Sequence, residues 1–207
     1  MLMLAFDTCL DKTYTVLRTE EDILSSETIR SDEKNYHSAY LFSSIKSMLK
    51  SSGKTAEDID VIAVNVGPGS FTGIRACLTT AKVMSSQIKC KTVGVSSLEV
   101  LSRAGGKDCV VALDARKNKV YFYDKKLYGA IDTESACEFV KGRKVITDNR
   151  LIELFRLNAD EVISYEDADF ELGEVLSEIA LEKIKNGAYT KDITPLYIQS
   201  PPVLSSL

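Results

Sequence analysis

The hydrophobic pattern of the first fifty residues changes its period once, and this change restricts the fold. Three short runs with strand character occupy residues 2–7, 13–19 and 23–29. The polar segments CLDK and EED between them are short enough for hairpin turns. Three consecutive strands joined in this way form an antiparallel meander, and the pattern that follows them is helical.

The segment after the meander has the spacing of an amphipathic helix. Leu41, Ile45, Met48 and Leu49 fall on one face, and Gly53 stands where a C-terminal cap belongs. An almost wholly apolar run comes next, which is typical of a strand buried on both sides in a helix-covered parallel sheet. After the first helix we therefore predict a strand at 61–66, a helix at 72–88, a strand at 91–95 and a helix at 97–104.

The segment GGKD at 105–108 predicts a boundary, which divides the chain into an N-terminal lobe at 1–105 and a C-terminal lobe at 106–207. The pattern of the second lobe is weaker, above all between residues 127 and 144. Its predicted elements are strands at 110–113, 120–123, 144–147 and 161–165 and helices at 150–157 and 171–186. The tail from residue 199 on is predicted to be loosely held.

Composition excludes several classes of protein. Hydrophobic residues make up 44% of the 207 residues, enough for a folded core, and the net charge of −4 argues against strong unaided binding to nucleic acid. We expect no membrane span, because no apolar run is long enough, and no signal peptide, because the N-terminus lacks basic residues. The five cysteines are widely spaced without a CxxC pair, which favours reduced thiols in a cytoplasmic protein and no metal site.

The segment VGPGSFTGIR at 66–75 has the composition of a phosphate-binding loop. A Walker loop requires Lys and then Ser or Thr after its final glycine, but Ile and Arg follow Gly73. The dinucleotide fingerprint requires two residues between its second and third glycines, whereas three separate Gly69 from Gly73. The segment therefore predicts a tight turn with Ser70 or Thr72 as the N-cap of the following helix.

The helix after this loop is apolar on two sides. One stripe consists of Ile74, Cys77, Leu78 and Ala81, and a second stripe of smaller residues consists of Ala76, Thr79, Thr80 and Val83. A helix that is apolar on two sides is packed on two sides, and one of them can cover the sheet. The other side is interpreted either as part of a fully buried core helix or as a protein–protein contact face.

Five segments in this order resemble the TsaB (YeaZ) family, bacterial proteins needed to make threonylcarbamoyladenosine in tRNA. They are LAFDT at 4–8, DVIAVNVGPGSFTGIR at 60–75, VGVSSLEVLS at 93–102, DARKNKVY at 114–121 and PLYIQ at 195–199. The resemblance implies an α/β fold of the actin-like ATPase (sugar kinase/Hsp70/actin) architecture. That architecture has two RNase-H-like lobes, of which the second is abbreviated in this chain.

The resemblance also implies that the chain performs no chemistry. The related transferase TsaD binds a metal through two histidines, and Ser97 and Leu101 stand at the corresponding positions here. Serine is a poor ligand for such metals and leucine is none. His37, the single histidine of the sequence, cannot by itself build a metal site or a Ser-His-Asp triad. We therefore predict no catalytic residue and no metal.

A residual nucleotide site is an alternative for the first loop. In this fold class Asp7 and Thr8 correspond to a phosphate-facing loop, but a kinase needs further acidic groups to hold Mg²⁺. Asp114 is a candidate second carboxylate, although we interpret it as orienting the turn before Arg116. No cofactor is predicted for the chain alone, and ATP or ADP would enter only at the level of a complex.

With catalysis excluded, the two N-terminal helices are interpreted as a partner-binding surface. The resemblance implies that they pair with the matching helices of a TsaD-like transferase, and with a second copy of this chain when the transferase is absent. The predicted partner-binding residues are His37, Tyr40, Ser44, Ser47, Ser70, Phe71, Arg75, Ala76, Thr79, Thr80 and Val83.

The predicted function is that of a non-catalytic subunit required for threonylcarbamoylation of the adenosine next to the anticodon. It activates a TsaD-like transferase, and a TsaE-like ATPase joins the assembly. The acidic net charge suits this role, since the partners would carry most of the tRNA contact. The main alternative is a stand-alone actin-fold ATPase or phosphotransferase, and a peptidase is a third interpretation.

Overall fold

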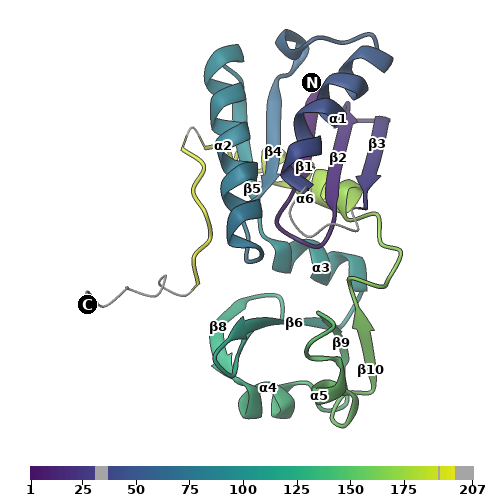
Figure 1. The fold of residues 1–207 in the computed structure, drawn as a ribbon, viewed down its shortest axis with the longest axis vertical. Helices are drawn as coiled ribbons and strands as arrows, with labels where there is room; N and C mark the ends of the chain where they lie inside the picture. Colours follow the sequence, from purple (N-terminus) through teal and green to yellow (C-terminus); the bar gives the residue numbers. More distant parts are fainter. Residues whose placement is uncertain (31–36, 191, 199–207) are drawn as a thin grey trace, which may run out of the picture. The chain divides into compact units, whose positions relative to one another are not determined.

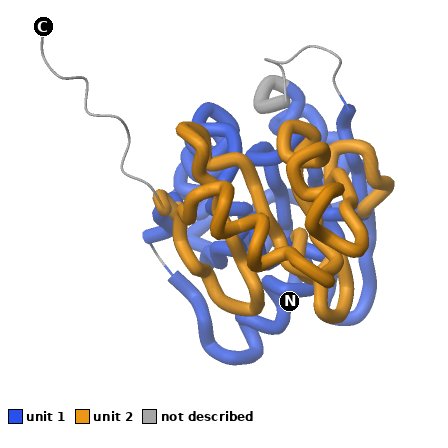
Figure 2. Tube along the Cα trace, turned by 90° about the horizontal axis from the view of Figure 1, so that it is seen from below, with its two compact units in different colours: residues 1–100, 171–195 blue, residues 101–170, 196–207 orange. Residues whose placement is uncertain are grey.

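The computed structural model describes residues 1–30, 37–190 and 192–198, with no side chains described for 37–39. The described chain forms two compact units (Figure 2). Unit 1 combines Met1–Val100 with Glu171–Pro195, and unit 2 contains Leu101–Phe170 together with residues 196–198. The tail from 199 on, predicted to be loosely held, lies outside the described residues.

Unit 1 is built on a five-stranded sheet in the order β3-β2-β1-β4-β5 (Figure 1). Its strands are β1 (Met3–Asp7), β2 (Thr13–Arg18), β3 (Ile23–Ile29), β4 (Val61–Asn65) and β5 (Lys91–Val95). The first three are antiparallel, and β1, β4 and β5 run parallel to one another. The predicted meander and buried parallel strands are confirmed, because tight turns join antiparallel neighbours while parallel neighbours need a crossover helix.

Helices cover both faces of this sheet. α1 (His37–Ser51) and α2 (Phe71–Ile88) share one face, and α6 (Leu172–Lys185) covers the other (Figure 1). Side chains alternate along a strand, so Leu4 and Phe6 of β1 pack with α1 and α2. On the opposite face, Gly173 of α6 lies close against Tyr14 of β2. A short 3-10 helix, η1 (Ala56–Asp58), precedes β4, and α3 (Ser97–Gly105) follows β5.

Unit 2 holds a second five-stranded sheet in the order β10-β9-β6-β7-β8. Its elements are β6 (Cys109–Arg116), β7 (Lys119–Tyr123), β8 (Leu127–Asp132), α4 (Thr133–Phe139), β9 (Lys144–Thr147), α5 (Ile152–Arg156) and β10 (Glu161–Ser164). The sequence pattern did not predict β8 and α4. β8 is an edge strand without a fully buried residue, so it lacks the apolar alternation that marks a half-buried strand.

The two units differ from the predicted lobes in the position of α6 and in the boundary, which falls after Val100 within α3. α6 follows unit 2 in the sequence, but it packs on the first sheet and so belongs to unit 1. Its apolar stripe covers the face that α1 and α2 leave open, which is why a division at residue 105 does not separate the compact units. Among the described residues, no helix combines the length and the apolar character needed to cross a membrane.

Candidate functional site

The glycine loop between β4 and α2 packs against the backbone that follows β1. A Cβ atom on Gly73 would lie 1.9 Å from the carbonyl oxygen of Thr8, and one on Gly69 would lie 2.3 Å from that of Cys9. The Thr8 hydroxyl also donates a hydrogen bond to the Gly73 carbonyl at 2.7 Å. Both glycines are therefore required because another backbone segment occupies the space of a side chain.

Backbone N–H groups of this loop donate hydrogen bonds to acceptors within the protein. The Gly67 N–H donates to Asn65 Oδ1 at 2.8 Å, and the Ser70 N–H donates to the Cys9 carbonyl at 2.8 Å. The Ser70 hydroxyl accepts from the Gly73 N–H at 3.3 Å, which confirms one of the two predicted N-caps of α2. A phosphate cradle needs converging N–H groups that are open to the ligand, so this arrangement favours a structural role for the loop.

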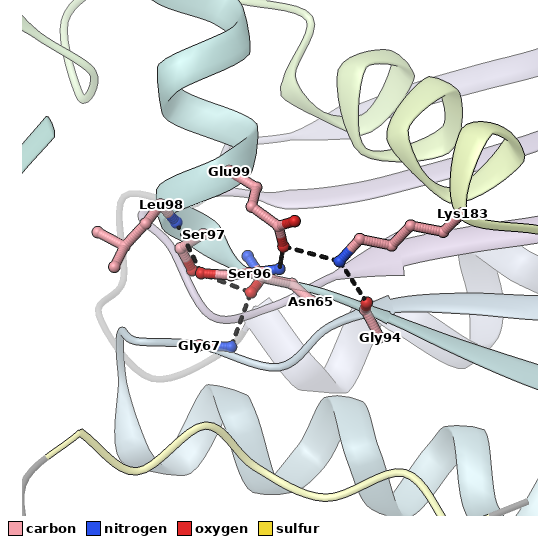
Figure 3. Close-up of polar contacts among 8 residues, drawn as sticks. All are labelled: Asn65, Gly67, Gly94, Ser96, Ser97, Leu98, Glu99 and Lys183. Carbon is pink, nitrogen blue, oxygen red and sulfur yellow. Dashed lines mark hydrogen bonds and ion pairs between the residues drawn. The ribbon is translucent and has the colours of Figure 1, made fainter. Parts of the chain in front are cut away.

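A buried asparagine at the end of β4 hydrogen-bonds the start of α3, which follows β5 (Figure 3), and also the end of β1. Asn65 Oδ1, at the end of β4, accepts from Ser97 Oγ at 2.9 Å, and Asn65 Nδ2 donates to Asp7 Oδ2 at 2.8 Å. Ser97, aligned by the resemblance with a metal-binding histidine of TsaD, is fully buried and uses its hydroxyl in this network. Leu101, at the other aligned position, is also fully buried. Neither side chain supplies a metal ligand.

An ion pair fastens α6 to the same end of the sheet in unit 1 (Figure 3). Lys183 Nζ lies 2.8 Å from Glu99 Oε2 and donates to the Gly94 carbonyl at 3.1 Å. Glu99 Oε2 also accepts from the Ser96 N–H at 2.8 Å, at the start of α3. These charges satisfy each other and nearby backbone groups, so we interpret them as structural.

Asp7 carries an unusual pKa because it is buried at the end of β1. Loss of water raises its pKa from 3.8 to about 6, although hydrogen bonds from the Cys9 N–H at 2.6 Å and from Asn65 oppose the shift. The side chains of Asp7 and Thr8 are 1% and 2% exposed. Both residues predicted to face a nucleotide are therefore buried and hydrogen-bonded within the protein, and neither is presented to a ligand.

This buried carboxyl predicts a loss of stability with rising pH. Folding raises the pKa of Asp7, so its stabilising contribution is complete below about pH 4 and is lost as the pH rises through about 6. The change amounts to roughly 3 kcal/mol for a shift of this size. The pKa values of Asp124 and Asp132 are lowered by hydrogen bonds, so their titration changes the stability only at lower pH.

Urea titrations between pH 4.5 and pH 7 test this expectation. The free energy of unfolding of the natural chain should fall over this range, and the Asp7→Asn variant should lose most of that slope. An equal slope in both proteins would show that Asp7 is not the titrating group.

Asp7, Cys9 and Cys77 form the single group of three potential metal ligands found in the part of the chain that the structure describes. Their ligand atoms lie within 4.8 Å of one another. The sequence did not predict this group, because folding alone brings α2 beside the end of β1. The Cys9 thiol donates to the Asn65 carbonyl at 3.4 Å and the Cys77 thiol to that of Phe6 at 3.5 Å. Burial raises the pKa of the Cys9 thiol well above its ordinary value, which disfavours the thiolate that a metal requires.

Asp114 in unit 2 organises the turn between β6 and β7. Its Oδ1 accepts from the Arg116 N–H at 2.8 Å, and its Oδ2 accepts from Arg150 Nη1 at 3.0 Å. Arg116, Lys117 and Asn118 all have positive φ, as a tight hairpin turn requires. The interpretation of Asp114 as the residue that orients this turn is confirmed.

Exposed apolar side chains gather on the two helices that share one face of the first sheet. Tyr40 and Phe42 of α1 are 48% and 57% exposed, and Phe71 and Val83 of α2 are each 54% exposed. We use the name α1–α2 surface for ten of the exposed residues of these helices: Tyr40, Phe42, Lys46, Ser47, Lys50, Phe71, Arg75, Thr79, Lys82 and Val83. Exposed aromatic side chains are enriched among the residues that anchor protein interfaces, so these helices are a candidate contact face.

The structure corrects part of the predicted partner-binding set. Ser44 is buried, and its hydroxyl contacts Thr15 of β2 and Glu27 of β3, so it faces the sheet. Thr80 is 8% exposed and Ala76 is half-buried. The side chain of His37 lies outside the described part of the chain, while Ser70 is exposed at the N-cap of α2. Apolar spacing alone does not reveal which side of a helix its neighbours cover.

Phe42 belongs to this surface, but the sequence prediction omitted it. It lies roughly 200° around the helix from Ser44, given about 100° per residue. Because Ser44 faces β3, Phe42 lies on the opposite side of α1. The sequence did carry a signal for this exposure, because Phe42 is an aromatic residue that lies outside the apolar stripe of an amphipathic helix.

Comparison with known proteins was made on sequence and on structure. Residues 23–167 match the family of TsaD, described as tRNA N6-adenosine threonylcarbamoyltransferase. The tRNA threonylcarbamoyladenosine biosynthesis protein TsaB of Bacillus subtilis is 34% identical over 124 residues, which cover 58% of this chain and 53% of that protein. TsaB of Escherichia coli is 30% identical over 91 residues, which cover 42% of this chain and 39% of that protein.

The structural similarity extends over almost the whole chain. YeaZ from Pseudomonas aeruginosa has a TM-score of 0.74 and 20% identity, with 95% of this chain and 99% of that chain covered. These findings confirm the resemblance to TsaB and YeaZ and the predicted fold class. In sequence, the chain spans about half the length of the first curated relatives it matches, 59% and 53%.

Proposed function

Because the chain belongs to the family of TsaD, the tRNA N6-adenosine threonylcarbamoyltransferase, we propose that it takes part in threonylcarbamoyladenosine biosynthesis. It acts in the cytoplasm as a partner subunit without catalytic activity of its own, as its similarity to TsaB favours. It binds a TsaD-like transferase and activates it toward the adenosine next to the anticodon. A TsaE-like ATPase joins the assembly, and tRNA is contacted mainly through these partners.

The exposed α1–α2 surface is the observation that carries this proposal. Its aromatic residues Tyr40, Phe42 and Phe71 are about half exposed although they stand on helices that otherwise bury their apolar faces. Aromatic side chains of this kind anchor protein interfaces, since they bury much area with few rotatable bonds. A partner that covers both helices would remove this apolar area from water.

The proposed lack of catalytic activity is supported by groups of α3 and by groups that follow β1 and β4. Ser97 and Leu101 are buried at the two positions aligned with metal-binding histidines. Asp7 and Thr8 bond to the protein's own backbone, and the glycine loop is packed on that same segment. A stand-alone actin-fold ATPase or phosphotransferase needs these groups to face phosphates and Mg²⁺.

Reconstitution with purified components tests the proposal. The reaction contains unmodified tRNA, threonylcarbamoyl-adenylate, the TsaD-like transferase and TsaE-like ATPase of the same organism, and this chain. We expect modified tRNA to form at least tenfold faster when the chain is present, and no ATP hydrolysis above background by the chain alone. Magnesium-dependent ATP turnover by the isolated chain would instead support the ATPase alternative.

A further inference from the structure

The charges of the α1–α2 surface all have one sign. Lys46 and Lys50 of α1 and Arg75 and Lys82 of α2 are exposed, and neither helix contains Asp or Glu. The whole chain nevertheless has a net charge of −4, so this surface is basic on an otherwise acidic protein. Such a contrast gives the surface a local potential opposite to that of the remaining protein.

Two of the cations lie next to exposed apolar groups of this surface. The Arg75 guanidinium lies over the Phe71 ring, 5.4 Å from its centroid. Lys82 lines the same surface hollow as Val83, which is 54% exposed. Any partner that covers these apolar groups also removes water from the adjacent cations, which then need acceptors from the partner.

The acidic groups described next to the two helices lie mainly at the margins of this surface, although Asp192 lines the same surface hollow as Lys82 and Val83. Glu27 of β3 accepts a hydrogen bond from Ser44, on the side of α1 that faces the sheet edge. Glu57 and Asp58 lie in η1, beyond the C-terminal end of α1, and the carboxylate of Asp58 accepts from the Thr55 N–H. Within the described part of the chain, Lys46, Lys50 and Arg75 form no ion pair, so we expect their acceptors to come from a docked partner.

A second copy of this chain would place positive charges against the positive charges of this surface. In a two-fold symmetric contact the same patch faces itself, so cations of one copy would meet cations of the other. An acidic partner would instead pair each cation and gain from electrostatic attraction during encounter. Charge complementarity thus separates these two occupants, although both could cover the apolar residues.

We propose that the α1–α2 surface selects a partner whose facing surface is acidic around an apolar centre, in preference to a second copy of this chain. The inference rests on the proposed function, in which that partner is the TsaD-like transferase. It adds the chemistry by which the surface distinguishes the transferase from self-association, and it gives the two complexes opposite dependence on salt.

Salt titration of the two complexes is the experiment. The Debye length, over which charges interact before salt screens them, shortens from about 10 Å at 0.1 M salt to about 3 Å at 1 M. With the TsaD-like transferase as the probe, we expect the dissociation constant measured by calorimetry to rise at least tenfold between 0.05 M and 0.5 M NaCl. Sedimentation of the chain alone should show self-association that strengthens over the same range.

A charge-reversal variant assigns the effect to these helices. Lys46→Glu combined with Lys82→Glu should weaken transferase binding at least tenfold at 0.05 M NaCl, with little difference from the natural chain at 0.5 M. Lys185→Glu on α6 is the matched control, because it changes one exposed lysine on the opposite face of the sheet.

Each result has a distinct meaning. Binding that is equally strong at both salt concentrations would overturn the charge inference and leave the proposed function standing. Self-association that is tighter than transferase binding at low salt would also overturn it. No binding of the transferase at any salt concentration would overturn the inference and the proposed function together.

Discussion

Replacing Val83 by glutamate is expected to weaken binding of the TsaD-like transferase about 100-fold, or ~2.7 kcal/mol. Val83 stands on the outward side of α2 and is 54% exposed, so the substitution leaves the core of unit 1 unchanged. A buried interface would have to accept a carboxylate in place of an apolar group, and the docked surface that we infer is itself acidic. Calorimetric titration of the transferase with the variant measures the loss.

Leu157→Glu is the control for this substitution. Leu157 is 89% exposed in unit 2, so the change introduces the same charge at an exposed apolar position that does not belong to the α1–α2 surface. The control should bind the transferase as the natural chain does, and both variants should unfold at the same urea concentration as the natural chain. Equal binding by Val83→Glu and the natural chain would exclude this surface as the docking face.

Replacing Gly73 by alanine is expected to destabilise unit 1 by at least about 3 kcal/mol, the upper end for overpacking in a tightly filled site. The added methyl group would lie 1.9 Å from the carbonyl oxygen of Thr8, which is backbone and cannot rotate away. Helix propensity alone predicts the opposite sign, a gain of about 1 kcal/mol for this substitution inside a helix. A decrease in the free energy of unfolding would therefore indicate that the loop packs closely on the end of β1.

Urea unfolding of Gly73→Ala and of Thr72→Ala measures this effect. Thr72 is the preceding residue in the first turn of α2, but it is exposed. Its replacement should change the free energy of unfolding by less than about 1 kcal/mol, as most surface substitutions do. If Gly73→Ala were as stable as the control, the glycine would not be needed for contact with Thr8 and the loop would be open for another role.

Local sequence pattern determined most of the first unit. The meander, the first two helices and the parallel strands follow from a period of two or of 3.6 and from short polar turns, all of which act between near neighbours. The spacing at Gly69 and Gly73 also excluded a Walker loop and a dinucleotide loop from the sequence alone. In unit 2 the same reasoning missed β8 and α4, whose residues are mostly half-exposed and carry little apolar contrast.

The tertiary structure decided which residues are available and what the glycines are for. Ser44 and Phe42 are two positions apart on α1, and only the packing of that helix on β2 and β3 buries the first and exposes the second. The pKa of Asp7 depends on the desolvation that surrounding elements impose, and α6 joins unit 1 because of the sheet face it covers. Periodicity records that a face is apolar, whereas burial depends on segments distant in the sequence that come to lie against it.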